Sequence, residues 1–457
     1  MNRLSEEQLD AFNDYKNGDN IFLTGPGGCG KSYLLKTIIN HARNNGKRIS
    51  VCAMTGCAAV LLGEKAKTVH SWAGIGLGKG DFHILACKIK ANKFKKIMWT
   101  KTDILIVDEV SMMSKNMFEL LDYIGGHVRE DPRPYGGIQL IFSGDFYQLP
   151  PVNKSNINND DSKFCFESRL WDTTFKQQIL LDKVFRQSDK KYIDILNEVR
   201  EGEMCKETIK TLETRLISNM GYKDGDVILH NETKPVKLMP IKIAVKNIND
   251  LEMNKLEEEP IIYNCETKYT VPQYAESNPS FKKPTDKQIE HESNFIIKNA
   301  LFDEKLVLKL GCQVMCIANI DIDNGICNGS TGKIIEFSGK DKTPVIRFTN
   351  GSTRSIGKFE WKSDSIPGLV VKQIPFILAW AVTIHKSQGA SLDCAEIDIG
   401  SRIFASGQTY VALSRVRSLD GLYLRSFNHT RINTEKKVRT FYDRFYEFDE
   451  EEEEDAK

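Results

Sequence analysis

The sequence predicts an α/β fold with two domains, each a parallel sheet flanked by helices. The chain has 457 residues, which is more than the roughly 100–200 residues of a typical domain. Within the first 150 residues, short apolar runs rich in β-branched residues alternate with longer helical patterns. A second alternation of this kind follows in the later part of the chain. Such alternation is typical of parallel strands joined by helices.

The first domain supplies the clearest elements. We predict strands at Ile21–Thr24, Ile49–Ala53, Ile104–Val107 and Ile138–Phe142, and helices at Lys31–Arg43 and Lys115–Val128. In the second domain we predict strands at Lys242–Val245, Ala395–Ile399 and Gly421–Leu424. Residues 257–298 are rich in Pro, Asn, Lys and Glu, which indicates an inserted loop or a surface elaboration. Residues 305–375 contain short strands punctuated by Gly and Asn, which favours a small β-barrel inserted in the second domain.

Composition excludes several classes of protein. Hydrophobic residues make up 40% and charged residues 27% of the chain, and no apolar run reaches the roughly 18 residues that cross a bilayer. The N-terminal residues resemble neither a secretory signal nor a transit peptide. We therefore expect a soluble intracellular protein without a membrane partner, placed in the nucleus if eukaryotic and in the host cell if viral. Eleven cysteines lie scattered without a C-x-x-C pair, which predicts reduced thiols.

The net charge of +1 conceals an uneven distribution. The last eleven residues, 447–457, hold eight acids and one base, so the rest of the chain has 62 basic and 54 acidic residues. A mildly basic body suits a polyanionic ligand. The acidic end is expected to be a disordered tail; docking of a protein partner, or mimicry of DNA, is the alternative.

The sharpest motif is G-x-x-x-x-G-K-[ST], placed after an apolar strand and before a helix. Its residues are Gly25, Pro26, Gly27, Gly28, Cys29, Gly30, Lys31 and Ser32, called the P-loop below. Glycines let backbone N–H groups surround phosphate oxygens at the positive end of a helix. Lys31 would neutralise the β- and γ-phosphates of ATP, and the Ser32 hydroxyl would bind Mg²⁺.

A second strand ends in two acids, Asp108 and Glu109. Asp108 is the candidate Mg²⁺ ligand, and Glu109 is the candidate residue to orient or deprotonate the attacking water. Taken alone, the pair could equally be surface acids that cap a helix. Beside a P-loop, the catalytic interpretation is favoured.

Seven segments in order resemble the Pif-type (petite integration frequency) helicases of superfamily one, type B. They are LSEEQLDAF (Leu4–Phe12), Thr55–Gly76, YGGIQLIFSGDFYQLPPV (Tyr135–Val152), VFRQ (Val184–Gln187), NGSTG (Asn328–Gly332), AWAVTIHKSQGASLD (Ala379–Asp393) and GQTYVALSRVRS (Gly407–Ser418). The resemblance implies that Gln8 reads the adenine, that Gln148 senses the γ-phosphate and that Gly389 lies at the nucleotide. It also implies that Arg186 and Arg415 reach the nucleotide from the second domain, where a planar cation would meet phosphoryl charge.

Contacts to a DNA strand are also implied by the resemblance. Hydroxyls, an ammonium group and imidazoles suit sequence-independent phosphate contacts, and the matching residues are Thr55, Thr68, His70, Ser71, Thr383, His385 and Lys386. The two histidines could instead be packed at a domain seam. Trp72, Phe94 and Trp99 are candidates for stacking on bases, although aromatic residues are more often core residues.

The resemblance further implies two RecA-like P-loop domains, at 1–175 and 176–446. A wedge insertion is expected near 73–100 and an SH3-like β-barrel near 326–372. The implied activity is ATP- and Mg²⁺-dependent translocation 5′ to 3′ on single-stranded DNA with unwinding of forked duplex, in replication, repair, recombination or telomere maintenance. G-quadruplexes and RNA–DNA hybrids are further candidate substrates, and a monomer is expected. The alternatives are a RecD-like recombination helicase, a translocase or protein-stripping ATPase without productive unwinding, and a DNA-binding scaffold with a decayed ATP site.

Overall fold

The computed structural model describes residues 4–62, 66–76, 78–151, 162–187, 189–222, 234–272, 283–321, 324–363 and 366–455. The chain forms two compact units. The first comprises Met1–Ile209, Phe404–Ser414 and His429–Lys457, and the second comprises Lys210–Ile403 and Arg415–Asn428. Each unit contains a parallel sheet, so the predicted α/β class is confirmed.

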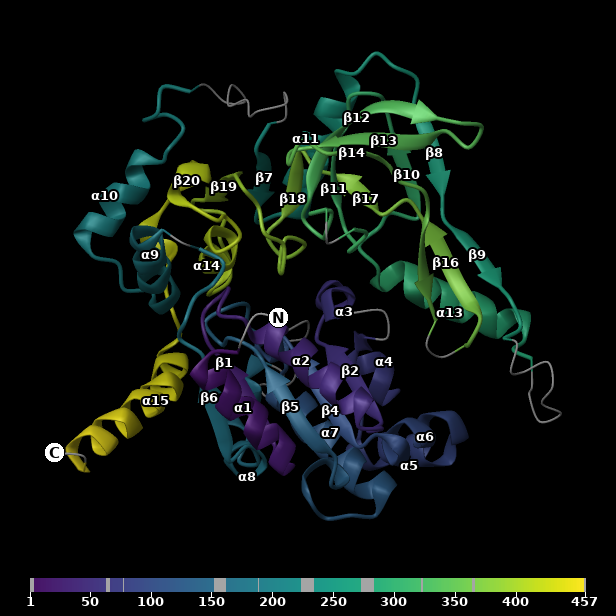
Figure 1. Ribbon diagram of the computed structural model, residues 1–457, viewed down its shortest axis with the longest axis vertical. Helices are drawn as coiled ribbons and strands as arrows, with labels where there is room; N and C mark the ends of the chain where they lie inside the picture. The colour runs from purple at the N-terminus through teal and green to yellow at the C-terminus, as the bar shows by residue number, and fades with distance from the viewer. Residues whose placement is uncertain are drawn as a thin grey trace. The chain divides into compact units, whose positions relative to one another are not determined.

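The sheet of the first unit has six strands among the described residues, in the order β3-β2-β4-β5-β1-β6, and every neighbouring pair is parallel (Figure 1). The strands are β1 (Ile21–Thr24), β2 (Ile49–Ala53), β3 (Lys67–Thr68), β4 (Ile104–Asp108), β5 (Gln139–Ser143) and β6 (Gln177–Leu180). All four predicted strands of this domain are confirmed, two of them to the residue.

Successive side chains of these strands enter two different hydrophobic cores, because a strand directs alternate residues to opposite faces of its sheet. Ile21, Leu23 and Ile106 pack into one core with α1 (Glu6–Asn17), α2 (Lys31–Asn44) and α3 (Gly56–Leu62). Phe22 and Leu105, whose side chains point to the opposite face of the sheet, enter the other core. Helices therefore cover both faces, which explains why the inner strands β1 and β4 are largely apolar rather than alternating.

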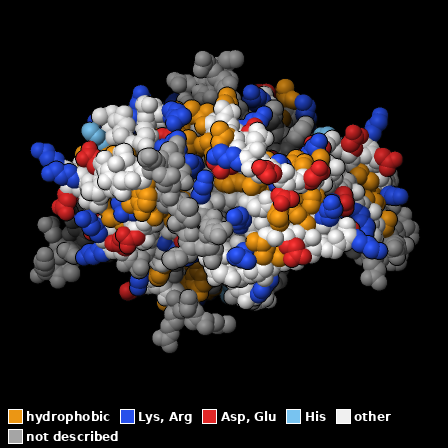
Figure 2. Space-filling view, turned by 90° about the horizontal axis from the view of Figure 1, so that it is seen from above, with side chains coloured by type: hydrophobic (Ala, Val, Ile, Leu, Met, Phe, Trp, Pro, Cys, Tyr) orange, Lys and Arg blue, Asp and Glu red, His pale blue; other side chains and the backbone are white. Residues whose placement is uncertain are grey.

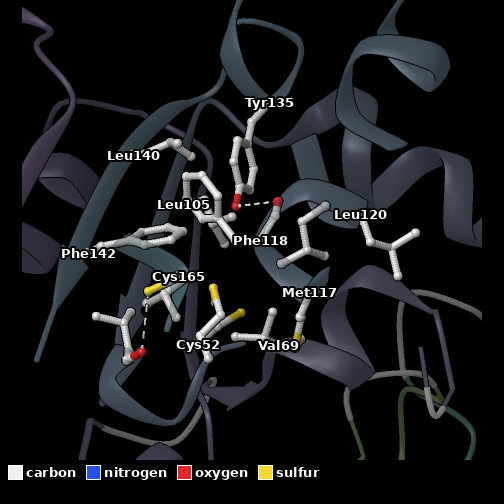
Figure 3. Packing of buried hydrophobic residues seen from close by; sticks show 14 of the residues in the cluster. Cys52, Val69, Leu105, Met117, Phe118, Leu120, Tyr135, Leu140, Phe142 and Cys165 are labelled. Carbon is white, nitrogen blue, oxygen red and sulfur yellow. Dashed lines mark hydrogen bonds between the residues drawn. The ribbon is translucent and has the colours of Figure 1, made fainter. Parts of the chain in front are cut away.

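The second of these cores is rich in aromatic residues (Figure 3). It packs Leu105 and Phe142 against α7 (Lys115–Arg129), which presents Phe118 and Leu121. The Tyr135 hydroxyl donates to the carbonyl of Phe118 at 3.2 Å, so the one polar atom of that ring is satisfied inside the core. The helices α4 (Val69–Ala73), α5 (Phe82–Ala91) and α6 (Lys93–Lys101) contribute to the same core. Helices α5 and α6 lie in the range predicted for the wedge insertion, and that assignment stays a prediction.

The second unit has a parallel sheet in the order β18-β7-β19-β20. Its strands are β7 (Val236–Met239), β18 (Ala381–Thr383), β19 (Ala395–Ile399) and β20 (Leu422–Phe427). The predicted strands at Ala395–Ile399 and Gly421–Leu424 are confirmed. The predicted strand at Lys242–Val245 is wrong, because these residues begin the helix α11 (Lys242–Asn254), in which Ile243 is 71% exposed. A short apolar run does not distinguish a strand from a turn of helix.

Antiparallel sheets occupy the rest of the second unit. One has the order β14-β13-β12-β11-β17, a second has β15-β16-β9, and a third pairs β10 with β8. The strands are β8 (Ile261–Asn264), β9 (Glu266–Tyr269), β10 (Lys305–Leu308), β11 (Gln313–Cys316), β12 (Thr331–Ser338), β13 (Thr343–Phe348), β14 (Thr353–Ser355), β15 (Phe359–Lys362), β16 (Leu369–Gln373) and β17 (Phe376–Leu378). The short strands predicted within residues 305–375 are confirmed. An SH3-like barrel formed by them stays a prediction.

The polar stretch 257–298 contains β8, β9 and most of α13 (Asp286–Asn299), so the described part of it is more than a loop. The remaining helices are α8 (Trp171–Thr174), α9 (Lys190–Glu201), α10 (Lys206–Thr214), α14 (Gln408–Leu413) and α15 (Lys436–Asp455). Helix α15 continues through most of the acidic end, where a disordered tail was predicted; glutamate is a good helix former. Each cysteine whose side chain the structure describes is a free thiol, and none of the described helices is long and apolar enough to cross a membrane.

Candidate functional site

The predicted nucleotide residues of the first unit follow strands of one sheet. The P-loop follows β1, Asp108 and Glu109 end β4, and Gln148 comes shortly after β5. Because β4, β5 and β1 are parallel neighbours, their carboxyl ends meet at one edge of the sheet. Ligands of open α/β sheets bind at this edge. The topology therefore gathers residues that are more than one hundred positions apart in the chain.

The P-loop has a backbone that only glycine adopts readily. Gly25, Gly28 and Gly30 have φ values of +139°, +95° and +89°. A Cβ on Gly25 would lie 2.3 Å from the carbonyl oxygen of Leu181, and one on Gly28 would lie 2.5 Å from Cβ of Arg186. The loop is therefore fixed both by its dihedral angles and by its close neighbours.

Lys31 begins α2 and turns its ammonium group toward the loop. Nζ donates to the carbonyl oxygens of Gly25 at 2.7 Å and Pro26 at 3.0 Å, and contacts Sγ of Cys29 at 3.4 Å. These contacts hold the positive charge within the loop, at the N-terminus of a helix that also attracts anions. The arrangement fits the phosphate-binding role predicted for Lys31.

Gln8 lies against the P-loop, as its predicted role requires. Its Nε2 donates to the carbonyl of Cys29 at 3.4 Å, while its Oε1 accepts from the backbone N–H of Ser5 at 3.1 Å. The second bond belongs to a capping box that begins α1. Gln8 thus links the start of α1 to the loop, and its role in reading adenine stays a prediction.

The two acids at the end of β4 differ in environment. Asp108 is buried, and its Oδ1 accepts from the backbone N–H of Glu109 at 2.9 Å. Burial raises the pKa of Asp108, while that hydrogen bond and the charge of Lys31 oppose the rise. Glu109 has a left-handed backbone with φ of +59°, which is uncommon outside glycine and frequent at functional turns.

A magnesium ion would find suitable ligands here. One carboxylate, Asp108, and one hydroxyl, Ser32, belong to elements that meet at the same sheet edge. Mg²⁺ is commonly held by one or two protein ligands together with phosphate oxygens and waters. Among the described residues there is no cluster of three or more His, Cys, Asp and Glu side chains that could hold a metal ion.

Gln148 is almost fully buried in the turn that follows β5. Its Nε2 donates to Oδ2 of Asp145 at 3.4 Å, and its backbone N–H donates to the carbonyl of Asp145 at 2.9 Å. The side chain is thus held by the turn from which it comes. Such restraint suits a residue that must present its amide to a phosphate or a water.

The two predicted arginines belong to different units. Arg186 lies in the first unit, where its Cβ is next to Gly28 and its Nη1 donates to the carbonyl of Ser414 at 3.2 Å. Arg415 belongs to the second unit and is buried. Arg186 is therefore beside the P-loop within one unit, although the resemblance assigned it to the second domain. The roles of both side chains in catalysis stay predictions.

The predicted strand-binding residues of the first unit lie after β2 and β3 and are half-buried. Oγ1 of Thr55 accepts from the N–H of Ala58 at 3.2 Å, and Oγ1 of Thr68 accepts from the N–H of Ser71 at 3.3 Å. Each hydroxyl therefore caps the N-terminus of a short helix, Thr55 that of α3 and Thr68 that of α4. His70 and Ser71 occupy the first turn of α4, next to the Thr68 cap.

The predicted strand-binding residues of the second unit follow β18. Thr383 ends that strand, and its Oγ1 accepts from the N–H of Lys386 at 3.2 Å. His385 is half-buried, and burial together with the charge of Lys242 lowers its pKa. Gly389, with φ of +80°, makes the turn that follows. These residues lie together within their unit, and their ligands stay predictions.

Two of the three candidate stacking aromatics belong to the core. Trp72 and Trp99 are 1% and 0% exposed, with ring centroids 4.5 Å apart. Nε1 of Trp99 donates to the carbonyl of Ala73 at 3.2 Å. Both indoles belong to the hydrophobic core, which confirms for these two the alternative that aromatic residues are more often core residues. Phe94 is 80% exposed and stays a candidate. On the face drawn in Figure 2, basic side chains are interspersed with acidic and hydrophobic ones.

Comparison with known proteins identifies the family. The model of the PIF1-like helicase family matches residues 3–210, and that of the DNA helicase Pif1 2B domain matches residues 293–337. The crystal structure of Pif1 helicase from Candida albicans is similar with a TM-score of 0.76 and 33% identity, covering 97% of this chain and 100% of that one. The chain belongs to the PIF1-like helicase family.

Other members show how far the likeness extends. ATP-dependent DNA helicase PIF1 of Homo sapiens is 35% identical over 444 residues, which are 96% of this chain and 63% of the human protein. The chain thus spans just under two thirds of the length of the curated relatives that it matches. A Bacteroides Pif1 helicase in complex with ADP-AlF3 and ssDNA is similar with a TM-score of 0.65 and 27% identity, covering 98% of each chain.

Two groups at this PIF1-like site were missed by the sequence reasoning. Tyr410 accepts from the backbone N–H of Gly27 at 2.7 Å through its hydroxyl, and its place in the GQTYVALS segment was the available signal. Asp145 holds Gln148, and its place in GDFYQ was the corresponding signal. The buried partners of Asp145 on α9 and α15 had no sequence signal, because only folding brings those helices to the turn.

Proposed function

We propose that the chain is an ATP-dependent DNA helicase that moves 5′ to 3′ on single-stranded DNA and unwinds duplex ahead of it. One observation carries the proposal: Lys31, Asp108, Glu109 and Gln148 follow neighbouring parallel strands at one sheet edge. This arrangement supplies a phosphate cradle, a metal ligand, a base and an amide sensor. Relatives that are named helicases over most of the chain support the same activity.

Each residue has a defined task in the proposed hydrolysis of ATP to ADP and phosphate. The P-loop N–H groups and Lys31 bind the phosphates, and Ser32 and Asp108 would hold Mg²⁺. When bound, Mg²⁺ reduces the charge on the β- and γ-phosphate oxygens. Glu109 orients the attacking water and accepts its proton, and Gln148 contacts the water or the γ-phosphate. Arg186 and Arg415 are assigned to the phosphoryl charge by the family resemblance alone.

The remaining assignments form part of the same proposal. We assign 1–175 and 176–446 to two RecA-like domains, with Gln8 and Gly389 at the nucleotide. Thr55, Thr68, His70, Ser71, Thr383, His385 and Lys386 are assigned to phosphate contacts with the DNA strand. The Bacteroides relative in complex with ssDNA supports a single strand as the substrate. Forked duplex, G-quadruplexes and RNA–DNA hybrids are the structures to compare. A monomer is proposed, and docking of a protein partner on the acidic end is the alternative to a solvated tail.

A translocase that strips proteins from DNA without unwinding is the alternative function. Both functions require ATP hydrolysis that is stimulated by single-stranded DNA, so only a strand-separation assay distinguishes them. Roles in replication, repair, recombination and telomere maintenance follow from the proposed unwinding activity.

The test uses duplexes that carry either a 5′ or a 3′ single-stranded tail, with ATP and Mg²⁺. The proposal expects strand separation of the 5′-tailed duplex only. It also expects Lys31→Ala to lose ATP hydrolysis by at least about 10²-fold while single-strand binding persists. Normal turnover in Lys31→Ala would refute the site. Hydrolysis without separation of either duplex would favour the translocase.

A further inference from the structure

A buried carboxylate organises the turn that carries Gln148. Asp145 is fully buried, and its two oxygens accept from groups of three different elements. Within the turn, Oδ2 accepts from Nε2 of Gln148 at 3.4 Å and Oδ1 accepts from the N–H of Tyr147 at 3.3 Å. The bond to Gln148 restricts the rotation of its amide. Whatever holds Asp145 in place therefore also positions Gln148.

Arg200 on α9 is the first outside group that holds this carboxylate. Its Nη2 donates to Oδ1 at 3.0 Å and its Nε donates to Oδ2 at 3.2 Å, so the guanidinium meets both oxygens. The guanidinium also lies over the ring of Tyr147, 4.3 Å from the centroid. Arg200 is 5% exposed. Burial opposes the charge of Arg200, but Asp145 together with the neighbouring tyrosines outweighs burial and raises the pKa of Arg200. The two-nitrogen fork fixes the orientation of the carboxylate.

Tyr442 on α15 is the second outside group. Its hydroxyl donates to Oδ1 of Asp145 at 3.4 Å and accepts from the N–H of Phe146 at 3.1 Å. The same hydroxyl lies 2.5 Å from Oγ1 of Thr24, the residue that precedes the P-loop. The Tyr442 ring stacks on Tyr147 with centroids 4.6 Å apart and planes at 19°. One hydroxyl therefore joins the end of β1 to the turn after β5.

A purely structural interpretation would treat these contacts as the means of attaching α15. The hydrophobic contacts of α15 already serve that purpose, because Val438, Phe441 and Tyr442 belong to the core beneath the sheet. The polar contacts instead converge on the two segments that carry the P-loop and Gln148. Attachment of α15 alone would not require the Tyr442 hydroxyl and the Arg200 guanidinium to be buried together at the Asp145 carboxylate.

We propose that Arg200 and Tyr442 are positioning residues for ATP hydrolysis, which act through Asp145 to set the orientation of Gln148 relative to the P-loop. This inference rests on the ATP hydrolysis proposed above. It assigns a catalytic effect to a residue of α15, which lies 297 residues after Asp145 in the chain. Arg200 and Tyr442 do not contact substrate themselves in this scheme.

The test is Tyr442→Phe, which removes one oxygen and keeps the stacked ring. Tyr446→Phe is the matched control, since it deletes a hydroxyl from the same helix where the residue is 50% exposed. We expect DNA-stimulated kcat to fall about ten-fold in Tyr442→Phe, the order lost with a misplaced catalytic group, with KM for ATP within about two-fold. We expect Tyr446→Phe to match the parent chain.

Nucleotide binding separates positioning from a loss of stability. In Tyr442→Phe the affinity for ADP with aluminium fluoride, which mimics the transferred phosphoryl group, should fall about ten-fold while that for ADP alone is unchanged. Arg200→Lys keeps the charge but lacks the two-nitrogen fork. For this variant too, the affinity for ADP with aluminium fluoride should fall while the affinity for ADP alone is unchanged. Arg200→Lys serves as the second variant if Tyr442→Phe fails to fold.

Two outcomes overturn the inference. One is unchanged kcat in both variants while the parent chain hydrolyses ATP and Lys31→Ala does not. The other is an equal loss of affinity for ADP and for ADP with aluminium fluoride, which indicates a general structural role. Failure of the parent chain to hydrolyse ATP with single-stranded DNA would instead refute the proposed function, so the two failures are distinguishable.

Discussion

Replacing Gly25 by alanine tests whether the P-loop is fixed by its backbone geometry. Gly25 has φ of +139°, and an added Cβ would lie 2.3 Å from the carbonyl oxygen of Leu181. That carbonyl belongs to the backbone directly after β6, where the N–H of Leu181 donates to the carbonyl of Thr24 at 2.9 Å. The obstacle is therefore backbone held by a strand, and it cannot turn away as a flexible side chain would.

The size of the effect follows from this contact. A contact of 2.3 Å must lengthen to an ordinary separation, so the loop must move by roughly 1 Å, and a shift of about 1 Å at a reacting group costs about 10²-fold in rate. The unfavourable dihedral angles add about 1–3 kcal/mol of strain. We expect kcat/KM for ATP to fall about 100-fold and the free energy of unfolding to fall by about 1–3 kcal/mol.

Gly357→Ala is the control outside the loop. Gly357 is not among the residues with positive φ, and its added Cβ would meet no atom within 4 Å. We expect its ATP hydrolysis to stay within about three-fold of the parent chain, since neither a backbone clash nor a strained dihedral arises. Phosphate release with single-stranded DNA and unfolding in urea measure both variants. Equal losses in the two variants, or normal turnover in Gly25→Ala, would refute the reasoning.

Two further predictions concern the base and the buried tryptophans. Glu109→Gln should bind ATP within about three-fold of the parent chain but hydrolyse it about 10²–10⁴-fold more slowly, because only the proton acceptor is lost; a collapse of ATP affinity in a binding titration would contradict the assigned role. Trp99→Ala should lower the free energy of unfolding by about 3–5 kcal/mol, whereas Phe94→Ala, at an 80% exposed position, should change it by no more than about 0.5 kcal/mol. Similar values for both in urea unfolding would show that Trp99 is not the core residue described above.

Sequence patterns were most informative where local structure and chemistry coincide. The strand at Ile21–Thr24 and the start of α2 at Lys31 were both predicted to the residue, because an apolar run, a glycine loop and a helical pattern are all short-range signals. The same signals failed at Lys242–Val245, where a short apolar run begins a helix with an exposed face. For Trp72 and Trp99 the sequence left two roles open, because aromatic character suits both stacking on bases and packing in a core, and the structure places both in the core.

By itself, the sequence determined the glycine-rich loop before α2, the two acids at the end of β4 and the α/β class, because each depends on neighbours in the chain. Only the tertiary structure decided which distant side chains support them. Arg200 and Tyr442 reach Asp145 from helices about 55 and 297 residues later in the chain. Such pairings depend on how helices pack over a sheet, and that packing is set by the complete core rather than by any local pattern.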